Sequence, residues 1–134
     1  REITDAKAQE VVTLYTGYVD ANPWDSISPH YLFKAAEVNI GIKQHKAAIS
    51  LYERLLEHYP EYDKRPETLY LIGFTYENHL DQMGKAREQY EALIEAYPSH
   101  KLAQDARYAI ENLGLSDEEL IEKFKAMQEE QAAN

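Results

Sequence analysis

The stretch Ala48–Gly73, AISLYERLLEHYPEYDKRPETLYLIG, decides the fold, because the chain repeats it imperfectly on both sides. The upstream copy reads VVTLYTGYVDANPWD and the downstream copy reads AREQYEALIEAYPSHK. All three copies contain a proline at the matching position: Pro23, Pro60 and Pro98. These prolines lie 37 and 38 residues apart. A fixed period of this size is typical of an array of helical repeats.

The aligned copies also share a pattern of side chains before the proline. A tyrosine lies eight residues before it, a bulky residue five before it, and a small or β-branched residue twelve before it. The proline ends a helix, because its ring cannot continue the hydrogen-bond ladder and it pushes the preceding residue out of the α region. A second helix then begins near Pro29 or Pro66, where a proline is well tolerated. Ser28 is the expected cap of the first of these helices.

Apolar residues at helical spacing extend this pattern along the chain. Thr4 or Asp5 is expected to cap the first helix, and Gly114 to follow the sixth. A seventh helix begins after Ser116, which forms a capping box with Glu119. The first six helices are predicted over residues 4–21, 29–41, 44–59, 66–79, 84–97 and 100–113.

Together these positions resemble the tetratricopeptide repeat. In that family, helix A carries a bulky residue, a large–small pair and an aromatic, and helix B carries alanine, an aromatic, a small residue and a closing proline. The first unit departs from this pattern at Asn39, where the family has an aromatic. The second unit matches at Leu69, Ile72, Gly73, Tyr76, Ala86, Tyr90, Leu93 and Pro98. The first unit matches at Leu32, Ala35, Ala36, Ala48, Tyr52, Leu55 and Pro60.

The resemblance implies an all-α, right-handed α-solenoid of about seven antiparallel helices in a single domain, residues 1–134. One helix pair cannot bury its apolar stripe alone, so neighbouring pairs stack and share it. The last helix is expected to cap the stack; the alternative is a docking helix for a second subunit. The expected units are a helix-B-like helix at 4–21, repeats at 29–60 and 66–98, and a degenerate repeat or C-terminal cap at 100–131.

The charge of the chain excludes some classes of partner. Its net charge is −10 at neutral pH. An acidic surface repels phosphate groups, which argues against nucleic acid and against docking on anionic lipid. No apolar run approaches the roughly 20 residues of a membrane-spanning helix. We therefore expect a protein or peptide partner and no transmembrane segment in this chain.

The titratable residues do not form a catalytic or metal-binding pattern. The absence of cysteine excludes disulfides, thiol catalysis and sulfur-bound zinc. No two histidines have the spacing that places two ligands on one helix face, and paired acids at i, i+4 are typical of a solvated face. Nucleotide-binding and hydrolase motifs are missing. We predict no enzyme activity, no metal and no cofactor. The histidines are His30, His45, His58, His79 and His100.

The resemblance also locates a binding surface, since helix A residues outside the A–B interface line a concave groove in this family. The groove is expected to hold an extended or helical peptide, anchored on Phe33, Tyr70 and Phe74. Its acidic rim favours a basic ligand. The alternative is that the first or last helix folds over this strip. The predicted groove residues are Phe33, Glu37, Ile40, Tyr70, Phe74, Glu77 and Asn78, with Ala106 and Ile110 in the third unit.

Other aromatic residues are expected mainly to pack between repeats. Tyr59 and Tyr97 each precede a repeat proline and are predicted to pack in the turns. Trp24 lies in the first link, where packing is favoured over binding.

The helix ends LLEHYP and LIEAYP resemble those of bacterial envelope repeat proteins of the YbgF/BamD type. This implies a non-enzymatic scaffold in the cell envelope or periplasm; the alternative is a cytoplasmic protein. The chain starts at Arg1 rather than Met, so one interpretation is that a signal or lipoprotein leader has been removed. A second functional hypothesis is a structural or assembly role through self-association as a homodimer.

Overall fold

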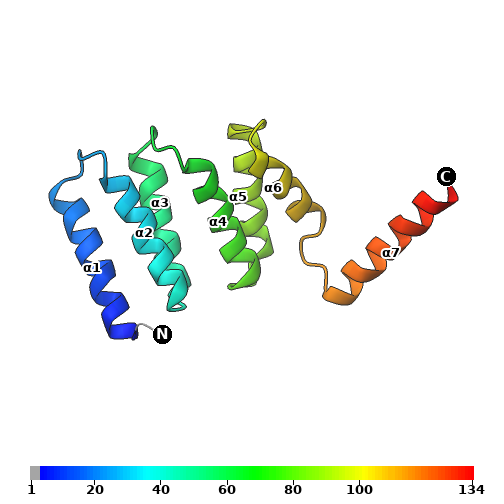
Figure 1. The fold of residues 1–134 in the computed structure, drawn as a ribbon, viewed down its shortest axis with the longest axis horizontal. Helices are drawn as coiled ribbons and strands as arrows, with labels where there is room; N and C mark the ends of the chain where they lie inside the picture. Colours follow the sequence, from blue (N-terminus) through cyan, green and yellow to red (C-terminus); the bar gives the residue numbers. More distant parts are fainter. Residues whose placement is uncertain (1–3) are drawn as a thin grey trace.

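The computed structural model describes residues 4–134, which form seven helices (Figure 1) and no strand. This confirms the all-α solenoid, and every predicted helix end lies within two residues of the observed one. Thr4 caps the first helix. The interpretation of a leader removed before Arg1 lies outside the described residues. The helices are α1 (Asp5–Ala21), α2 (Ser28–Gly41), α3 (His45–His58), α4 (Arg65–Asn78), α5 (Met83–Ala96), α6 (Lys101–Glu111) and α7 (Asp117–Ala133).

Helices α1 to α6 stand side by side in a row, each antiparallel to the next (Figure 1). Successive helices contact one another along the row, and α4 also contacts α6 directly. Helices α2, α4 and α6 are the A helices of the repeat, and α1, α3 and α5 are the B helices. The row therefore has two layers, with the A helices on one side and the B helices on the other.

Two clusters of buried side chains hold the row together. One cluster lies mainly between α1, α2 and α3 and includes Leu32 and Tyr52. The other lies between α4, α5 and α6 and includes Tyr90. Leu56 and Tyr76 pack against both clusters. A core divided in this way is what one-dimensional stacking produces, because each helix pair shares its apolar stripe only with its neighbours.

Small residues allow the A and B helices to approach closely, as predicted. Ala36, Ala48 and Ala86 are fully buried. Gly73 of α4 faces the ring of Tyr90 of α5, and a Cβ at Gly73 would lie 2.7 Å from Cε1 of that ring. The tyrosine ring therefore occupies the space that any side chain at this position would need.

Hydrogen bonds tie the turns to the helices before them. The Tyr59 hydroxyl donates to the carbonyl of Pro23 (2.7 Å), which confirms that Tyr59 packs between repeats. Two equivalent bonds follow the repeat. The Ser28 hydroxyl donates to the carbonyl of Asn22 (2.6 Å), and 37 residues later the guanidinium of Arg65 donates to the carbonyl of Tyr59 (3.1 Å). Each donor satisfies a free carbonyl at the C-terminal end of a B helix.

Two predicted helix ends are wrong in detail. Ser28 does not cap α2, because its hydroxyl is bonded to the end of α1 and Ile27 occupies the N-cap position. Gly114 does not directly follow α6, because the helix ends at Glu111 and Asn112 is its C-cap. Gly114 instead adopts a left-handed conformation (φ +81°) in the link to α7, which glycine adopts without steric cost.

Helix α7 leaves the row after the predicted capping box at residues 116–119, which is present. It runs away from α6 (Figure 1), and none of its residues is buried. The ring of Phe124 lies 6.3 Å from that of Tyr108 on α6, and Lys123 Nζ donates to Asn112 Oδ1 (2.6 Å). Within residues 4–134, α7 therefore does not form the expected cap over the last helix pair.

The sequence of α7 departs from the repeat pattern. At the position where α1 carries Val11, α3 carries Ala48 and α5 carries Ala86, the aligned residue of α7 is Leu120. Helix separation depends on the side chains at the contact, so a helix with leucine here packs at a greater distance than one with alanine. Within residues 4–134 the stack ends at α6, and α7 does not pack on α6 as a B helix.

We expect Gly73→Ala to destabilise the chain by about 1–3 kcal/mol, because the added methyl group meets the buried ring of Tyr90. Where space is open, the same change in a helix stabilises by roughly 0.5–1 kcal/mol. Gly17 in α1 supplies the matched control, since a Cβ there meets nothing within 4 Å. Urea unfolding of both variants measures the difference. If Gly73→Ala were as stabilising as Gly17→Ala, the close approach would not limit this crossing.

Two histidines stack where the α2–α3 and α4–α5 turns meet. The ring centroids of His45 and His79 lie 4.2 Å apart, with an angle of 17° between the ring planes. Nδ1 of His45 is buried and has no hydrogen-bond partner among residues 4–134. Burial lowers the pKa of His45, and the neighbouring His79 lowers it further. The folded chain therefore favours the neutral imidazole of His45.

This histidine makes stability depend on pH. Folding lowers the pKa of this imidazole, so the unfolded chain binds the proton more readily than the folded chain. The free energy of unfolding therefore decreases as the pH falls from about 6.5, the unfolded pKa, through the lower pKa of the folded chain. We expect His45→Gln to lose less unfolding free energy than the wild type between about pH 7.5 and pH 5. His58→Gln, at an exposed position at the end of α3, should follow the wild type. Parallel curves for the wild type and His45→Gln, from urea unfolding at each pH, would contradict this.

Candidate functional site

The A helices share one surface, which we call the A-face: the exposed sides of α2, α4 and α6. It contains two hollows that meet at Tyr70. The hollow between α4 and α6 has a volume of about 240 Å³, and the hollow between α2 and α4 has about 360 Å³. Both contain residues that were predicted to line a groove.

The α4–α6 hollow brings four predicted residues together. Tyr70, Phe74, Glu77 and Asn78 all line it. Their spacing, i, i+4, i+7 and i+8, places them on one side of α4. Because α4 is anchored in the core by its opposite side, these side chains are held in fixed positions relative to α6.

Aromatic rings form much of this hollow. The Tyr70 ring lies 6.4 Å from that of Phe74 and 5.6 Å from that of Tyr90. Phe74 is 41% exposed, and Tyr108, which enters the hollow from α6, is 51% exposed. Helix α7 reaches only the edge of this strip, where the ring of Phe124 stacks on that of Tyr108 at 6.3 Å, and both rings of the hollow stay exposed.

Negative charge surrounds the rings. The Tyr90 hydroxyl donates to Oε1 of Glu77 (2.8 Å). Burial, and then this hydrogen bond, raise the pKa of Tyr90. Burial raises the pKa of Tyr70, and the carboxylates of Asp105 and Glu77 raise it further. At neutral pH the phenols of the hollow are therefore neutral hydrogen-bond donors beside the carboxyl groups of Glu77 and Asp105.

The α2–α4 hollow corrects the prediction for Phe33. Phe33 lines this hollow but is only 5% exposed. Its ring packs edge-on against Tyr52 at 5.6 Å, and the ammonium group of Lys64 lies 5.4 Å from the ring centroid. Phe33 is therefore a core residue that forms one wall of the hollow and not an exposed anchor. Glu37 is exposed and lines the same hollow, as predicted.

Three other predicted positions lie outside the hollows. Ile40 is half-buried against the core cluster of α2 and α3 and lines neither hollow. On α6, Ala106 is fully buried and Ile110 packs against the second core cluster. These residues face the core because apolar side chains on an A helix also complete the stack.

The A-face offers exposed aromatic rings beside carboxyl groups. Within residues 4–134, no group of three or more potential metal ligands comes together. The phenols nearest the carboxylates have raised pKa values, which is the opposite of what an activated nucleophile needs. In the same part of the chain, no helix combines the length and apolar character needed to span a membrane.

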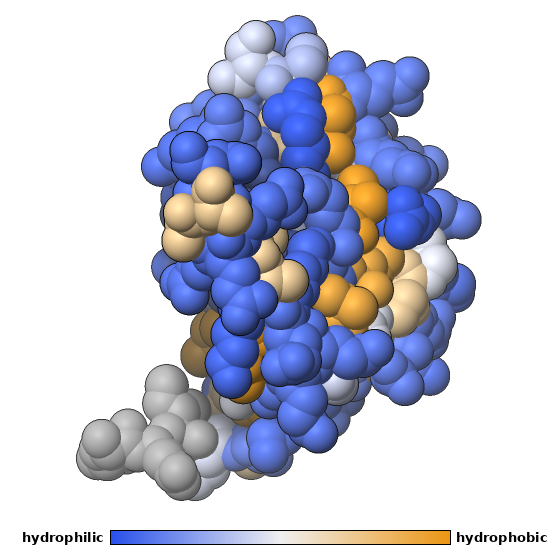
Figure 2. Space-filling view, turned by 90° about the vertical axis from the view of Figure 1, so that its right-hand side faces the viewer, coloured by the Kyte–Doolittle hydropathy of each residue, from blue (hydrophilic) through white to orange (hydrophobic). Residues whose placement is uncertain are grey.

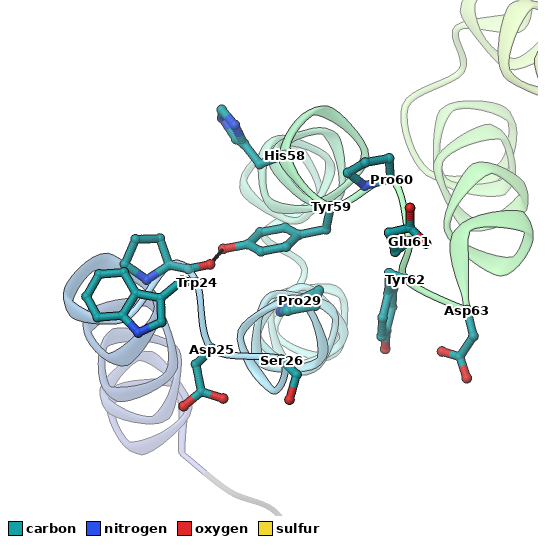
Figure 3. Close-up of a pocket in the computed structure, with 11 residues that line it drawn as sticks. Trp24, Asp25, Ser26, Pro29, His58, Tyr59, Pro60, Glu61, Tyr62 and Asp63 are labelled. Carbon is teal, nitrogen blue, oxygen red and sulfur yellow. Dashed lines mark hydrogen bonds between the residues drawn. The ribbon is translucent and has the colours of Figure 1, made fainter.

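A third and larger hollow, the turn cleft, lies between the α1–α2 link and the α3–α4 link (Figure 3). Its volume is about 570 Å³. Trp24 lies at its edge and is 80% exposed, so the expectation that this aromatic packs between repeats is wrong. The cleft was not predicted, because it joins two links that are distant in the sequence. Its aromatic and proline lining consists of Pro23, Trp24, Pro29, Tyr59, Pro60 and Tyr62.

The sequence profile of the tetratricopeptide repeat matches residues 31–62 and 67–100. These two stretches, which span α2–α3 and α4–α5, are therefore similar to tetratricopeptide repeats. Repeats of this family generally mediate protein–protein interactions. No curated protein matches the chain.

The repeat frame shows how the α6 residues of the A-face could have been found. In the second tetratricopeptide repeat, Tyr70 lies ten residues after Pro60, and Tyr108 lies ten residues after Pro98. Counting from the repeat proline therefore identifies Tyr108, whereas matching apolar residues selected core positions. The same count finds Asn112, the C-cap of α6, which lies fourteen residues after Pro98 as Phe74 lies fourteen after Pro60.

Proposed function

We propose that this chain is a non-enzymatic interaction scaffold that binds a peptide or protein segment on its A-face. The observation that carries the proposal is the exposure of Phe74 and Tyr108 on opposite walls of one hollow. Exposed aromatic rings beside a buried aromatic floor are typical of binding hot spots. The general role of tetratricopeptide repeats in protein–protein interaction supports the same conclusion.

The chemistry of the A-face favours a segment with apolar side chains and at least one basic residue. Glu77 and Asp105 place two carboxylates at the α4–α6 hollow. Asn78 adds an amide that can bond to a ligand backbone. Complementary charge speeds association, so we expect the association rate to fall as salt concentration rises.

The A-face is tested with peptides selected from a random library on the wild-type chain. We expect Phe74→Glu to weaken the selected peptides at least about tenfold, because it places a charge where an apolar side chain would be buried. Leu14→Glu on α1 is the matched control, since Leu14 is 69% exposed and lines neither hollow of the A-face. Binding is measured by calorimetry.

A second variant separates the A-face from the turn cleft. Trp24→Ala should leave unchanged the affinity of the peptides that Phe74→Glu weakens, since Trp24 lines neither hollow of the A-face. If the selected peptides bound Phe74→Glu as tightly as the wild type, the A-face would not be the binding surface.

The second candidate function is self-association through α7, which the exposure of that helix favours. Ile121, Phe124 and Met127 are 54%, 38% and 45% exposed. The end of the stack beside it also carries apolar surface, including Leu115. Seen from this end, hydrophobic surface runs as a strip between hydrophilic side chains (Figure 2). Helix α7 of a second copy would supply the missing B helix of α6, and the reciprocal exchange would give a two-fold dimer.

Light scattering over a dilution series tests this candidate. We expect Phe124→Glu to shift any dimer toward monomer by at least about tenfold in the dissociation constant, because it introduces a charge into the apolar stripe. Ala126→Glu adds the same charge on the opposite side of α7, where it is exposed, and should leave the equilibrium unchanged. A wild-type chain that stayed at 15.5 kDa throughout would rule out this function.

We also propose a setting in the bacterial cell envelope. What supports it is the similarity of the helix ends LLEHYP and LIEAYP to those of envelope repeat proteins. Recovery of the protein from the cytosolic fraction of its source cell, with none in the envelope fraction, would contradict the proposal.

A further inference from the structure

The turn cleft displays Trp24 from a link that is held rigid. The carboxylate of Asp25 accepts hydrogen bonds from the hydroxyl of Tyr18 and from the N–H of Ile27 (3.1 Å). The Ser28 hydroxyl fixes the other end of the link to α1 (2.6 Å). A large indole that stays 80% exposed on such a link contributes little to the core. Rigid, exposed aromatic side chains are frequent anchors in binding sites.

The cleft itself is also preorganised. Figure 3 shows Trp24 at one end, the ring of Tyr59 in the middle and that of Tyr62 at the other end. The bond from the Tyr59 hydroxyl to the Pro23 carbonyl (2.7 Å) joins the two links across the cleft. The Tyr62 hydroxyl lies 3.2 Å from Nδ1 of His30, which fixes its ring. Two of the three rings are therefore held by hydrogen bonds, and the third, Trp24, projects from a hydrogen-bonded link.

A series of flat rings along a shallow cleft fits a polyproline II helix. Such a segment has no internal hydrogen bonds and presents proline rings at regular intervals, which dock between aromatic side chains. Its carbonyl groups are free acceptors, and the exposed indole N–H of Trp24 is a donor. A preformed extended segment also loses little entropy on binding to a rigid cleft.

The charge of the cleft determines what should flank the prolines. Asp25, Glu61 and Asp63 line the cleft, and its lining contains no lysine or arginine. The hydrogen bond from Tyr18 lowers the pKa of Asp25, which keeps this carboxylate ionised. A basic residue beside the prolines is therefore favoured. A second copy of this chain is disfavoured as the occupant, because its own net charge is −10.

We propose that the turn cleft binds a proline-rich segment of another protein that carries an arginine or lysine next to its prolines. The prolines pack against Trp24, Tyr59 and Tyr62, and the basic side chain lies near Glu61 and Asp63. The site shares no lining residue with either hollow of the A-face, so it is independent of the function proposed there.

Trp24 is the single tryptophan of the chain and therefore reports directly on this site. The probes are synthetic peptides with a polyproline core and arginines at the N-terminal end, the C-terminal end or both. We expect at least one to shift the Trp24 emission to shorter wavelength and to move its one indole N–H resonance. Glycine–serine peptides with the same arginines, and polyproline peptides with glutamates in place of arginine, should bind at least about tenfold more weakly.

Variants assign the binding to the cleft. By calorimetry, Trp24→Ala should lower the affinity for the best peptide at least about tenfold. The double change Glu61→Lys and Asp63→Lys should lower it by a similar factor. Phe74→Glu on the A-face should leave this affinity unchanged. Trp24 is exposed, so its replacement should leave the thermal melt of the chain intact.

Three results would overturn the proposal. One is that no peptide of the set moves the indole resonance at millimolar concentration. Another is that the glycine–serine peptides bind as tightly as the polyproline peptides, which would indicate charge attraction alone. The third is that Trp24→Ala dissociates a dimer of the chain, which would make a second copy the occupant.

Discussion

The structure depends on the close approach of the A and B helices within each repeat, seen most directly where Gly73 meets the ring of Tyr90. The ring fills the crossing, and its buried hydroxyl donates to Glu77, one helical turn farther along α4. One tyrosine thus sets the helix separation and orients a carboxylate of the A-face. Because core and surface share this side chain, the geometry of the hollow follows from the packing of the stack.

The sequence predicted what depends on local periodicity. The spacing of the prolines gave the repeats, and the side of α4 that carries Tyr70, Phe74 and Glu77 follows from helical spacing alone. What it did not predict depends on contacts between distant segments. The burial of Phe33 requires Tyr52 and Lys64 on either side. The turn cleft exists because Tyr59 reaches the Pro23 carbonyl of the preceding turn, and no local pattern encodes that bond.

Helix α7 is a second case in which the local sequence predicted a helix but not its contacts. Its capping box and apolar stripe predicted a helix correctly, but they do not determine where a helix packs. The contacts that it does make involve Tyr108 and Asn112, and both residues also line the α4–α6 hollow. Any rearrangement of α7 therefore changes one wall of the A-face. Because one set of side chains serves both, a ligand that bound this hollow with different affinity for two positions of α7 would shift α7 between them.

The A-face and the turn cleft both carry acidic residues, yet they differ in shape. The A-face runs along helices and offers hollows in which single side chains are buried, whereas the turn cleft offers rings spaced along a shallow surface. Their lining residues do not overlap. A partner that carried both an apolar, basic segment and a nearby proline-rich segment would bind the second site at the high effective concentration set by its linker. Two individually weak contacts on one rigid stack would then give selective binding, because few proteins present both segments at the required separation.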